Sequence, residues 1–215
     1  MFYYIDFASQ NQPQNSRISG RNSRKGGFRQ AKAMVINMNQ HKKLQRMVLS
    51  ALFAALAYVL PFLTGQIPEI GAMLCPMHIP VLLCGYFCGP AWGAVVGIAA
   101  PLLRSLTLGM PPPFPTAVCM AAELAAYGAI AGWLHRHLPA RRGFVYVSLP
   151  AAMIVGRLVW GLAMTVCMGF GGGSFPLSAF LSGAVLNAVP GIILQLVLIP
   201  VLVMTLKPLT ESGTR

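Results

Sequence analysis

Four polar side chains stand inside or at the edge of long apolar stretches of this chain, where they need a chemical reason to be kept. They are Arg104, Glu123, Arg157 and Asn187. A charged side chain at the centre of a membrane-spanning helix costs about 2.5–3.5 kcal/mol on insertion scales. Two arginines against one glutamate favour a ligand that has an anionic group and a hydrogen-bonding remainder.

Aromatic side chains accompany two of these charges on the same helix faces. Tyr127 lies one helical turn from Glu123, and Trp160 lies one turn from Arg157. A partly apolar pocket with a few converging polar groups is the usual form of a small-molecule site. The alternative is a structural ion pair between Glu123 and Arg157 that only ties two helices together. Arg104, at a helix end, can also extend its charge toward the membrane surface.

The composition predicts helices embedded in a membrane. Hydrophobic residues make up 56% and charged residues 9% of the chain, and the mean hydropathy is +0.65, whereas soluble domains contain roughly 25% charged residues. Several continuous apolar runs reach the length of about 20 residues that a membrane helix needs, and they show no strand-like alternation. We therefore expect an all-α integral membrane protein.

The predicted topology depends on residues 77–103, a glycine-rich run that is too long for one span and short for two. If it crosses once, the basic loop 135–142 lies outside, against the positive-inside bias. If it turns near Gly89 and Pro90, all basic clusters and both termini become cytoplasmic. The second solution is better, and it predicts six transmembrane helices, at residues 47–64, 77–88, 91–107, 115–134, 144–168 and 175–206. The four polar side chains then fall between the middle of the membrane and its outer surface.

Small residues recur at helical spacing in two of these spans. Glycines repeat every four residues at Gly85, Gly89, Gly93 and Gly97, which predicts close packing of the hairpin. In the first span, a strip of alanines offers a surface on which another helix could dock. The strip contains Ala51, Ala54, Ala55 and Ala57. The alternative is that this strip packs against helices of the same protein.

Charge placement divides the chain into three segments. Residues 1–46 form a basic tail, expected to be disordered and cytoplasmic; residues 47–207 form the six-helix membrane domain; and residues 208–215 form a cytoplasmic C-terminal tail. Nine of the 16 lysines and arginines precede Met47. Lipid headgroups and topology account for these charges, so we expect contact with membrane lipid and no nucleic acid. Met34 and Met38 are plausible later starts.

Several function classes lack the residues they require. There is no phosphate-binding loop and hardly a carboxylate for magnesium, so energy for active transport must come from another subunit or an ion gradient. We expect no cofactor and no metal site, because Cys84 and Cys88 fit small buried hydrophobes and the histidines His78, His135 and His137 fit interfacial positions. The polar set offers no nucleophile beside a base, which argues against an enzyme.

The chain resembles the substrate-binding S components of energy-coupling factor (ECF) vitamin transporters over about residues 38–209. The resemblance rests on the alanine strip of the first span, the six-helix layout, the block HIPVLLCGYFCGPAWGAVVG at residues 78–97, and PPPFPT before the fourth helix. It implies that the alanine strip docks on a transmembrane coupling subunit and that two ATPase subunits supply the energy. It also implies a vitamin site on the outer side, formed by loops 65–76, 108–116 and 169–174 and by helices four to six. Those helices contain Glu123, Tyr127, Arg157, Trp160 and Asn187.

The expected function is that of a substrate-specific subunit in a bacterial plasma membrane. It would bind a vitamin-like solute on the outer side and deliver it inward with an ATP-driven module. Pantothenate fits an anionic ligand, as do a folate, lipoate or a flavin. The rival is a solitary secondary carrier that uses protons through Glu123 and needs no ATPase partner.

Overall fold

A computed structural model of the chain describes residue 38 and residues 40–64, 74–138, 142–170, 176–183 and 188–212. The chain divides into two units, Met1–Gln45 and Arg46–Arg215. The described residues of the first unit are helical. Disorder was predicted for the basic tail at residues 1–46. Residues 40–46 are instead helical, and residues 1–37 and 39 lie outside the described residues. The fold and the site belong to the second unit.

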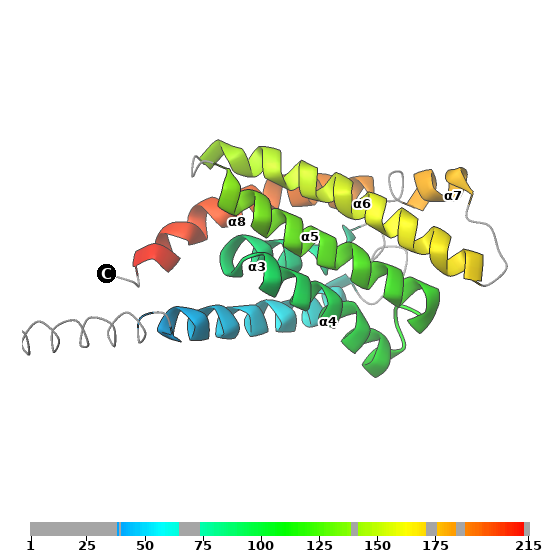
Figure 1. Cartoon of the computed structure of the whole chain (residues 1–215), viewed down its shortest axis with the longest axis horizontal. Coiled ribbons are helices and arrows are strands. Elements are labelled where there is room, and N and C mark those ends of the chain that lie inside the picture. The colour runs from blue at the N-terminus through cyan, green and yellow to red at the C-terminus, as the bar shows by residue number, and fades with distance from the viewer. Residues whose placement is uncertain are drawn as a thin grey trace, which may run out of the picture. The chain divides into compact units, whose positions relative to one another are not determined.

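The described residues form helices, and no strand occurs among them. The first helix, Gln40–Phe62, overlaps a short turn of helix, η1 (Leu60–Thr64). The elements that follow are α3 (His78–Cys88), α4 (Pro90–Leu108), η2 (Pro113–Ala117), α5 (Val118–His137), η3 (Arg142–Phe144), α6 (Val145–Phe170), α7 (Leu177–Leu181) and α8 (Val189–Ser212) (Figure 1). The all-helical prediction is therefore confirmed for this part of the chain.

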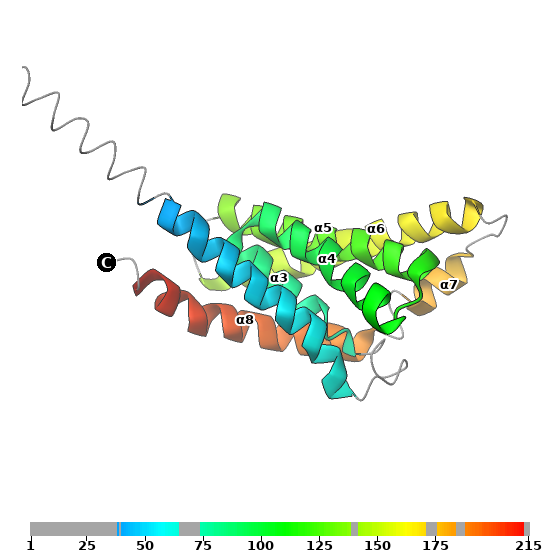
Figure 2. The same ribbon diagram turned by 90° about the horizontal axis from the view of Figure 1, so that it is seen from below.

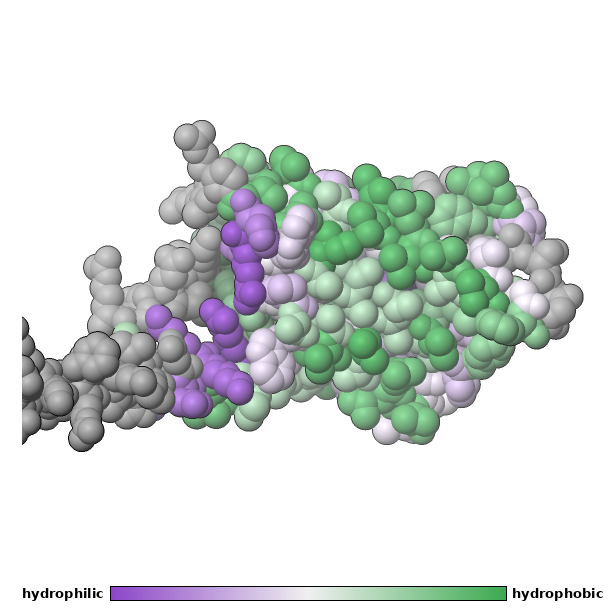
Figure 3. All heavy atoms as spheres, viewed as in Figure 1, coloured by the Kyte–Doolittle hydropathy of each residue, from purple (hydrophilic) through white to green (hydrophobic). Residues whose placement is uncertain are grey.

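Five helices are long and apolar enough to cross a membrane. They are Gln40–Phe62, Pro90–Leu108, Pro113–His137, Val145–Phe170 and Val189–Leu206. The remaining apolar helix, α3, has only 11 residues. Large apolar side chains are exposed on the long helices, as lipid contact requires, including Leu52, Ile98, Leu158 and Val197. Hydrophilic residues gather instead toward the end of the molecule at which α5 finishes (Figure 3).

The predicted turn between two short helices is confirmed, because α3 ends and α4 begins on either side of Gly89. Gly89 has φ of 99° and ψ of 176°, a conformation that is unfavourable for any residue with a side chain. Pro90 is the first residue of α4, where its missing N–H leaves no hydrogen bond unmade. The local sequence therefore ends one helix and starts the next without a loop.

Glycines bring α3, α4 and α5 into backbone contact. A Cβ added to Gly93 would lie 2.7 Å from the carbonyl oxygen of Gly128 and 2.8 Å from the Cα of Gly85. Gly97 lies similarly close to the backbone of Leu124. Because Gly85 and Gly93 precede and follow the turn yet meet the same Gly128, α3 and α4 run in opposite directions. The predicted glycine spacing thus packs the hairpin on itself and on α5.

The buried core lies around α5. This helix packs against α3, α4 and α6, and α8 in turn contacts α3 and α6 (Figures 1 and 2). These helices contribute fully buried side chains, including Leu82, Leu124, Leu149 and Ile199. A residue on the inner face of α5 is therefore surrounded by protein on several sides rather than by lipid.

Some predicted boundaries are wrong. The first helix begins at Gln40 rather than at residue 47, because an apolar run marks only the part of a helix that lies in hydrocarbon. One span over residues 175–206 is replaced by α7 and α8, with residues 184–187 outside the described part. Pro190 fits the first turn of α8 but not a helix interior. At its other end, α8 continues to Ser212, past the predicted end of the span at residue 206.

The glycine contacts can be tested with Gly93→Ala. The added methyl group would overlap two backbone atoms, so we expect a loss of about 1–3 kcal/mol, the usual range for overpacking. Gly169→Ala in α6 is the matched control, since nothing lies within 4 Å of a Cβ there and alanine is the better helix former. Thermal unfolding in detergent measures both variants. Equal melting temperatures would contradict the close helix packing.

Candidate functional site

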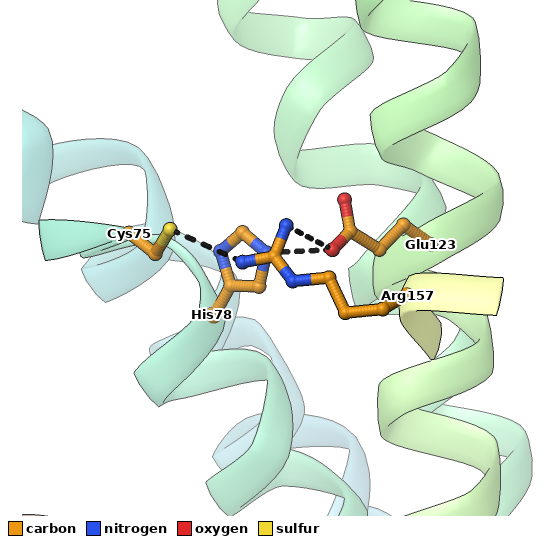
Figure 4. Close-up of polar contacts among 4 residues, drawn as sticks. All are labelled: Cys75, His78, Glu123 and Arg157. Carbon is orange, nitrogen blue, oxygen red and sulfur yellow. Dashed lines mark hydrogen bonds and ion pairs between the residues drawn. The ribbon is translucent and has the colours of Figure 1, made fainter. Parts of the chain in front are cut away.

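Glu123 and Arg157, two charges predicted to lie at similar depth, meet between α5 and α6. Glu123 is in the second turn of α5 and Arg157 is in the middle of α6. Arg157 Nη1 lies 2.9 Å from Glu123 Oε1, and the two side chains are 16% and 2% exposed (Figure 4). The ion pair named above as an alternative is therefore present. It joins α5 to α6 at a point that water barely reaches.

Two side chains that were not predicted to bind, His78 and Cys75, lie at the same point. His78 Nε2 is 3.5 Å from the same Glu123 Oε1, and its ring meets Tyr127 edge-on with centroids 5.2 Å apart. Arg157 Nη2 donates to Cys75 Sγ over 3.7 Å. We call these four residues the polar cluster: Cys75, His78, Glu123 and Arg157 (Figure 4). It gathers three separate parts of the chain.

The segment that enters α3 is shaped to present these side chains to α5 and α6. Cys75 has φ of 46°, and the His78 N–H donates to the Cys75 carbonyl oxygen over 3.0 Å. These features close a tight turn immediately before the helix. Pro80 stands in the first turn of α3, where its missing N–H is tolerated. The local sequence therefore starts the helix beside the ion pair.

The polar cluster is electrically balanced and enclosed. One carboxylate faces one guanidinium. His78 is 3% exposed, and neither of its ring nitrogens, Nδ1 or Nε2, has a hydrogen-bond partner among the described residues. Burial raises the pKa of the Cys75 thiol, and the nearby Arg157 partly opposes that rise, so the thiol stays uncharged. In the described part of the chain, no three His, Cys, Asp or Glu side chains are placed to hold a metal ion.

Of the two predicted aromatic residues, Tyr127 of α5 contacts the polar cluster through His78, and Trp160 lies one helical turn beyond Arg157 on α6. Gly156 lets α6 approach Tyr127 closely, because a Cβ there would lie 2.8 Å from the tyrosine ring. Trp160 stacks on Phe180 of α7, with ring centroids 6.2 Å apart and an interplanar angle of 27°. Gly161 leaves the space that the Phe180 ring occupies. Thus α7 covers this part of α6 with aromatic surface.

Arg104, near the end of α4, is only 5% exposed. Its Nη1 donates to the Tyr58 carbonyl oxygen over 3.2 Å, and its guanidinium lies 5.2 Å from the centroid of the Phe62 ring. The hydroxyl groups of Tyr58 and Thr107 are 3.0 Å apart. Arg104 therefore helps to tie the end of α4 to the first helix. Asn187, the sixth predicted binding residue, lies outside the described residues.

The alanine strip of the first helix divides between two environments. Ala51 and Ala55 are exposed. Ala54 is half-buried against the core, and Ala57 is fully buried within it. Packing against the protein's own helices, the alternative considered for this strip, therefore describes Ala57. Ala51 and Ala55 leave an exposed face of small residues.

The position of His78 beside Glu123 was missed because this residue was expected to lie near the outer loop. The short length of α3 could have predicted this position. A helix of 11 residues extends only about 16 Å, roughly half the hydrocarbon thickness. If one end lies at a membrane surface, the other must begin inside the protein, and His78 is its first residue. Nothing comparable in the sequence places Cys75, 82 residues from its partner Arg157.

Comparison with known proteins identifies a family. A family model described as ECF transporter, substrate-specific component, matches residues 45–203, which is most of the chain. The matched range contains the polar cluster and the exposed alanines of the first helix. No curated protein and no solved structure matches the chain.

The ion pair predicts that removing one partner is worse than removing both. Glu123→Ala leaves a buried guanidinium and Arg157→Ala leaves a buried carboxylate, and each should cost about 3–5 kcal/mol. The double variant should cost less than the sum of the single variants. Melting temperatures of all three in detergent measure this coupling, with Leu158→Ala, which removes a 59% exposed neighbour, as control. Strictly additive losses would rule out a direct pair.

Proposed function

Because this chain belongs to the family of ECF transporter substrate-specific components, we propose that it binds a vitamin-like solute on the outer side of a bacterial plasma membrane. An ATP-driven ECF module then passes the solute inward. As a member of the family it is a substrate-specific membrane subunit of a transporter, not an enzyme. The observation that carries the proposal is the polar cluster, which buries an ion pair among apolar helices.

The proposed binding site is built around the polar cluster and its aromatic neighbours. Glu123 and Tyr127 contribute from α5, and Arg157 and Trp160 contribute from α6. Buried charges beside aromatic rings provide both the polar contacts and the apolar walls of a small-molecule site. Two further residues belong to the proposal: the amide of Asn187, and Arg104, which would steady the first helix beside the outer opening.

The proposed ligand carries an anionic group and hydrogen-bonding groups. The planar guanidinium of Arg157 presents several N–H donors in a geometry that matches a carboxylate. Pantothenate fits this description and is the first compound to test, and folate, lipoate and a flavin are the others. The side chains of the proposed site favour an anionic ligand, and they do not distinguish among these four compounds.

We propose six crossings with both termini in the cytoplasm, and the direction of the helices supports this. The first helix and α4 end side by side, since Arg104 near the end of α4 contacts Tyr58. Both therefore run toward the same surface, and α3 must run back between them. With 11 residues, α3 covers only about 16 Å. In this topology α3 is the second crossing: it begins inside the protein and runs toward the cytoplasm.

The proposed partners are the transmembrane coupling subunit and two ATPase subunits of an ECF module. Family membership implies that a substrate-specific component works with such subunits. The exposed alanines Ala51 and Ala55 supply a small-residue face on which a partner helix could approach closely. We place the docking surface there, with Ala54 at its half-buried edge.

A second candidate function is a solitary proton-coupled carrier, which the position of His78 Nε2 3.5 Å from Glu123 Oε1 favours. Such a carrier needs no ATPase. Purified protein in liposomes separates the two functions. Uptake of labelled pantothenate driven by a proton gradient alone supports the carrier, whereas uptake that requires the coupling subunit, the ATPases and ATP supports the ECF subunit.

Arg157→Ala should weaken pantothenate binding by about tenfold or more, because a hydrogen bond to a charged group contributes roughly 1.5–3 kcal/mol. Isothermal titration calorimetry on the purified protein measures the change, and Leu158→Ala on the exposed side of α6 is the control. If Arg157→Ala and Glu123→Ala both bind like the wild type, the pocket is assigned to the wrong residues. If the wild type binds none of the four compounds, the ligand choice is wrong.

The docking surface predicts that Ala51→Trp/Ala55→Trp loses the ATPase subunits on copurification but keeps ligand binding. Two indole rings on the exposed face would prevent close approach of a partner helix. Ala91→Trp on α4, which also replaces an exposed alanine, is the matched control and should keep the partners. Loss of ligand binding together with the partners would instead indicate that the strip holds this protein's own helices together.

A further inference from the structure

His78 is a buried member of the polar cluster, and the proposed ECF function does not use its ionisable side chain. Its side chain is 4% exposed, and Nε2 lies 3.5 Å from Glu123 Oε1. An imidazole in this position can share a proton with the carboxylate. We propose that Glu123 and His78 form a proton-binding site, and that the ligand is an anion that enters together with one proton. The ligand half of this inference rests on the proposed function, whereas the proton site does not.

The inference follows from the charge of the polar cluster. Glu123 and Arg157 balance one another while Nη1 and Oε1 are 2.9 Å apart. An anionic group that pairs with Arg157 takes the guanidinium as its own counter-charge. Glu123 then keeps a negative charge that has lost its partner, in apolar surroundings where an uncompensated charge costs several kcal/mol. Binding an anion therefore requires one further positive charge at Glu123.

One proton restores the balance. The anion brings one negative charge, and one proton from water brings one positive charge, so the occupied cluster is neutral like the empty one. The proton forms either an O–H bond on the Glu123 carboxylate or an N–H bond on the His78 imidazole. Both forms have the same net charge. Because His78 offers a second atom to which the proton can bind, the pair takes up a proton more easily than a carboxylate alone.

No other side chain that faces Glu123 in the described structure can supply the charge. The ionisable groups around it are Cys75 and His78 before and at the start of α3, Arg157 from α6, and Tyr127 and Cys119 from α5. Thiol and phenol groups have no positively charged form under these conditions. From α4, Arg104 is occupied at the first helix. His78 is therefore the side chain beside Glu123, among these, whose chemistry allows it to accept a proton.

Arg157→Gln tests the proton site without any ligand, because it removes the guanidinium as an anion would. In an unfolded chain, glutamate keeps no proton above about pH 7, and histidine keeps almost none above about pH 8. If the folded variant holds one, its stability must fall as the pH rises, by about tenfold in the folding equilibrium per pH unit. Melting temperatures between about pH 7 and about pH 9 measure this. Glu123→Gln/Arg157→Gln, which needs no proton, is the matched control.

The expected result is that Arg157→Gln loses stability toward high pH relative to the control. Adding His78→Gln should move that loss to lower pH, because the carboxyl group then lacks its proton-sharing partner. The same pH dependence in Arg157→Gln and in the control would overturn the proton site. So would an Arg157→Gln protein that is unfolded at every pH while the control folds, since no proton would then be replacing the missing charge.

Pantothenate binding to the wild type tests the coupling to an anion. Calorimetry in buffers of different ionisation enthalpy counts the protons taken up, and we expect about one per pantothenate bound, and about none for Glu123→Gln. Binding without proton uptake would overturn the coupled entry of anion and proton. If pantothenate does not bind at all, the proposed ligand is wrong, and the Arg157→Gln pH series still decides whether the proton site exists.

Discussion

Glu123 and Arg157 are held 2.9 Å apart between apolar helices, and neither charge is stable there without the other. Each also has a second neighbour, since His78 lies beside Glu123 and Cys75 accepts a hydrogen bond from Arg157. Because Coulomb energies change steeply with distance where the dielectric constant is low, small shifts of these side chains carry a large cost. The pair therefore requires α3, α5 and α6 to be held in fixed positions.

Glycine packing supplies that fixation for two of the three helices. Contacts of Gly85, Gly93 and Gly128 join α3, α4 and α5 through backbone atoms, which leaves few side-chain rotamers to rearrange. Glu123 and His78 are thus carried by one block. Arg157 belongs to α6, which approaches that block at Gly156 and carries Trp160 and α7 beside it. The polar cluster lies across the boundary between the block and α6, where a ligand could exchange partners with the pair.

The sequence predicted the features that local chemistry or charge counting controls. The break at Gly89 follows from a positive φ and a proline at the first helical position, and the meeting of Glu123 with Arg157 follows from helix depth. It could not place Cys75, because neither spacing nor composition says which turn before α3 faces α6. Nor could it place the contact of Arg104 with the first helix, since the carbonyl that accepts its hydrogen bond, that of Tyr58, lies 46 residues away in the sequence. Contacts of that kind depend on how helices cross, which periodicity does not encode.

The short length of α3 determines both how this helix crosses the membrane and where its first residue lies. Gly89, directly after α3, lies against Arg136 in the last turn of α5, and Gly85 lies against Gly128, so α3 and α5 run in the same direction. From that shared end, 11 residues of α3 reach back about 16 Å and the 13 residues from Arg136 to Glu123 about 20 Å. A helix long enough to span the membrane would have carried His78 past the ion pair. The feature that makes α3 look too short for a crossing is what brings its first residue to Glu123.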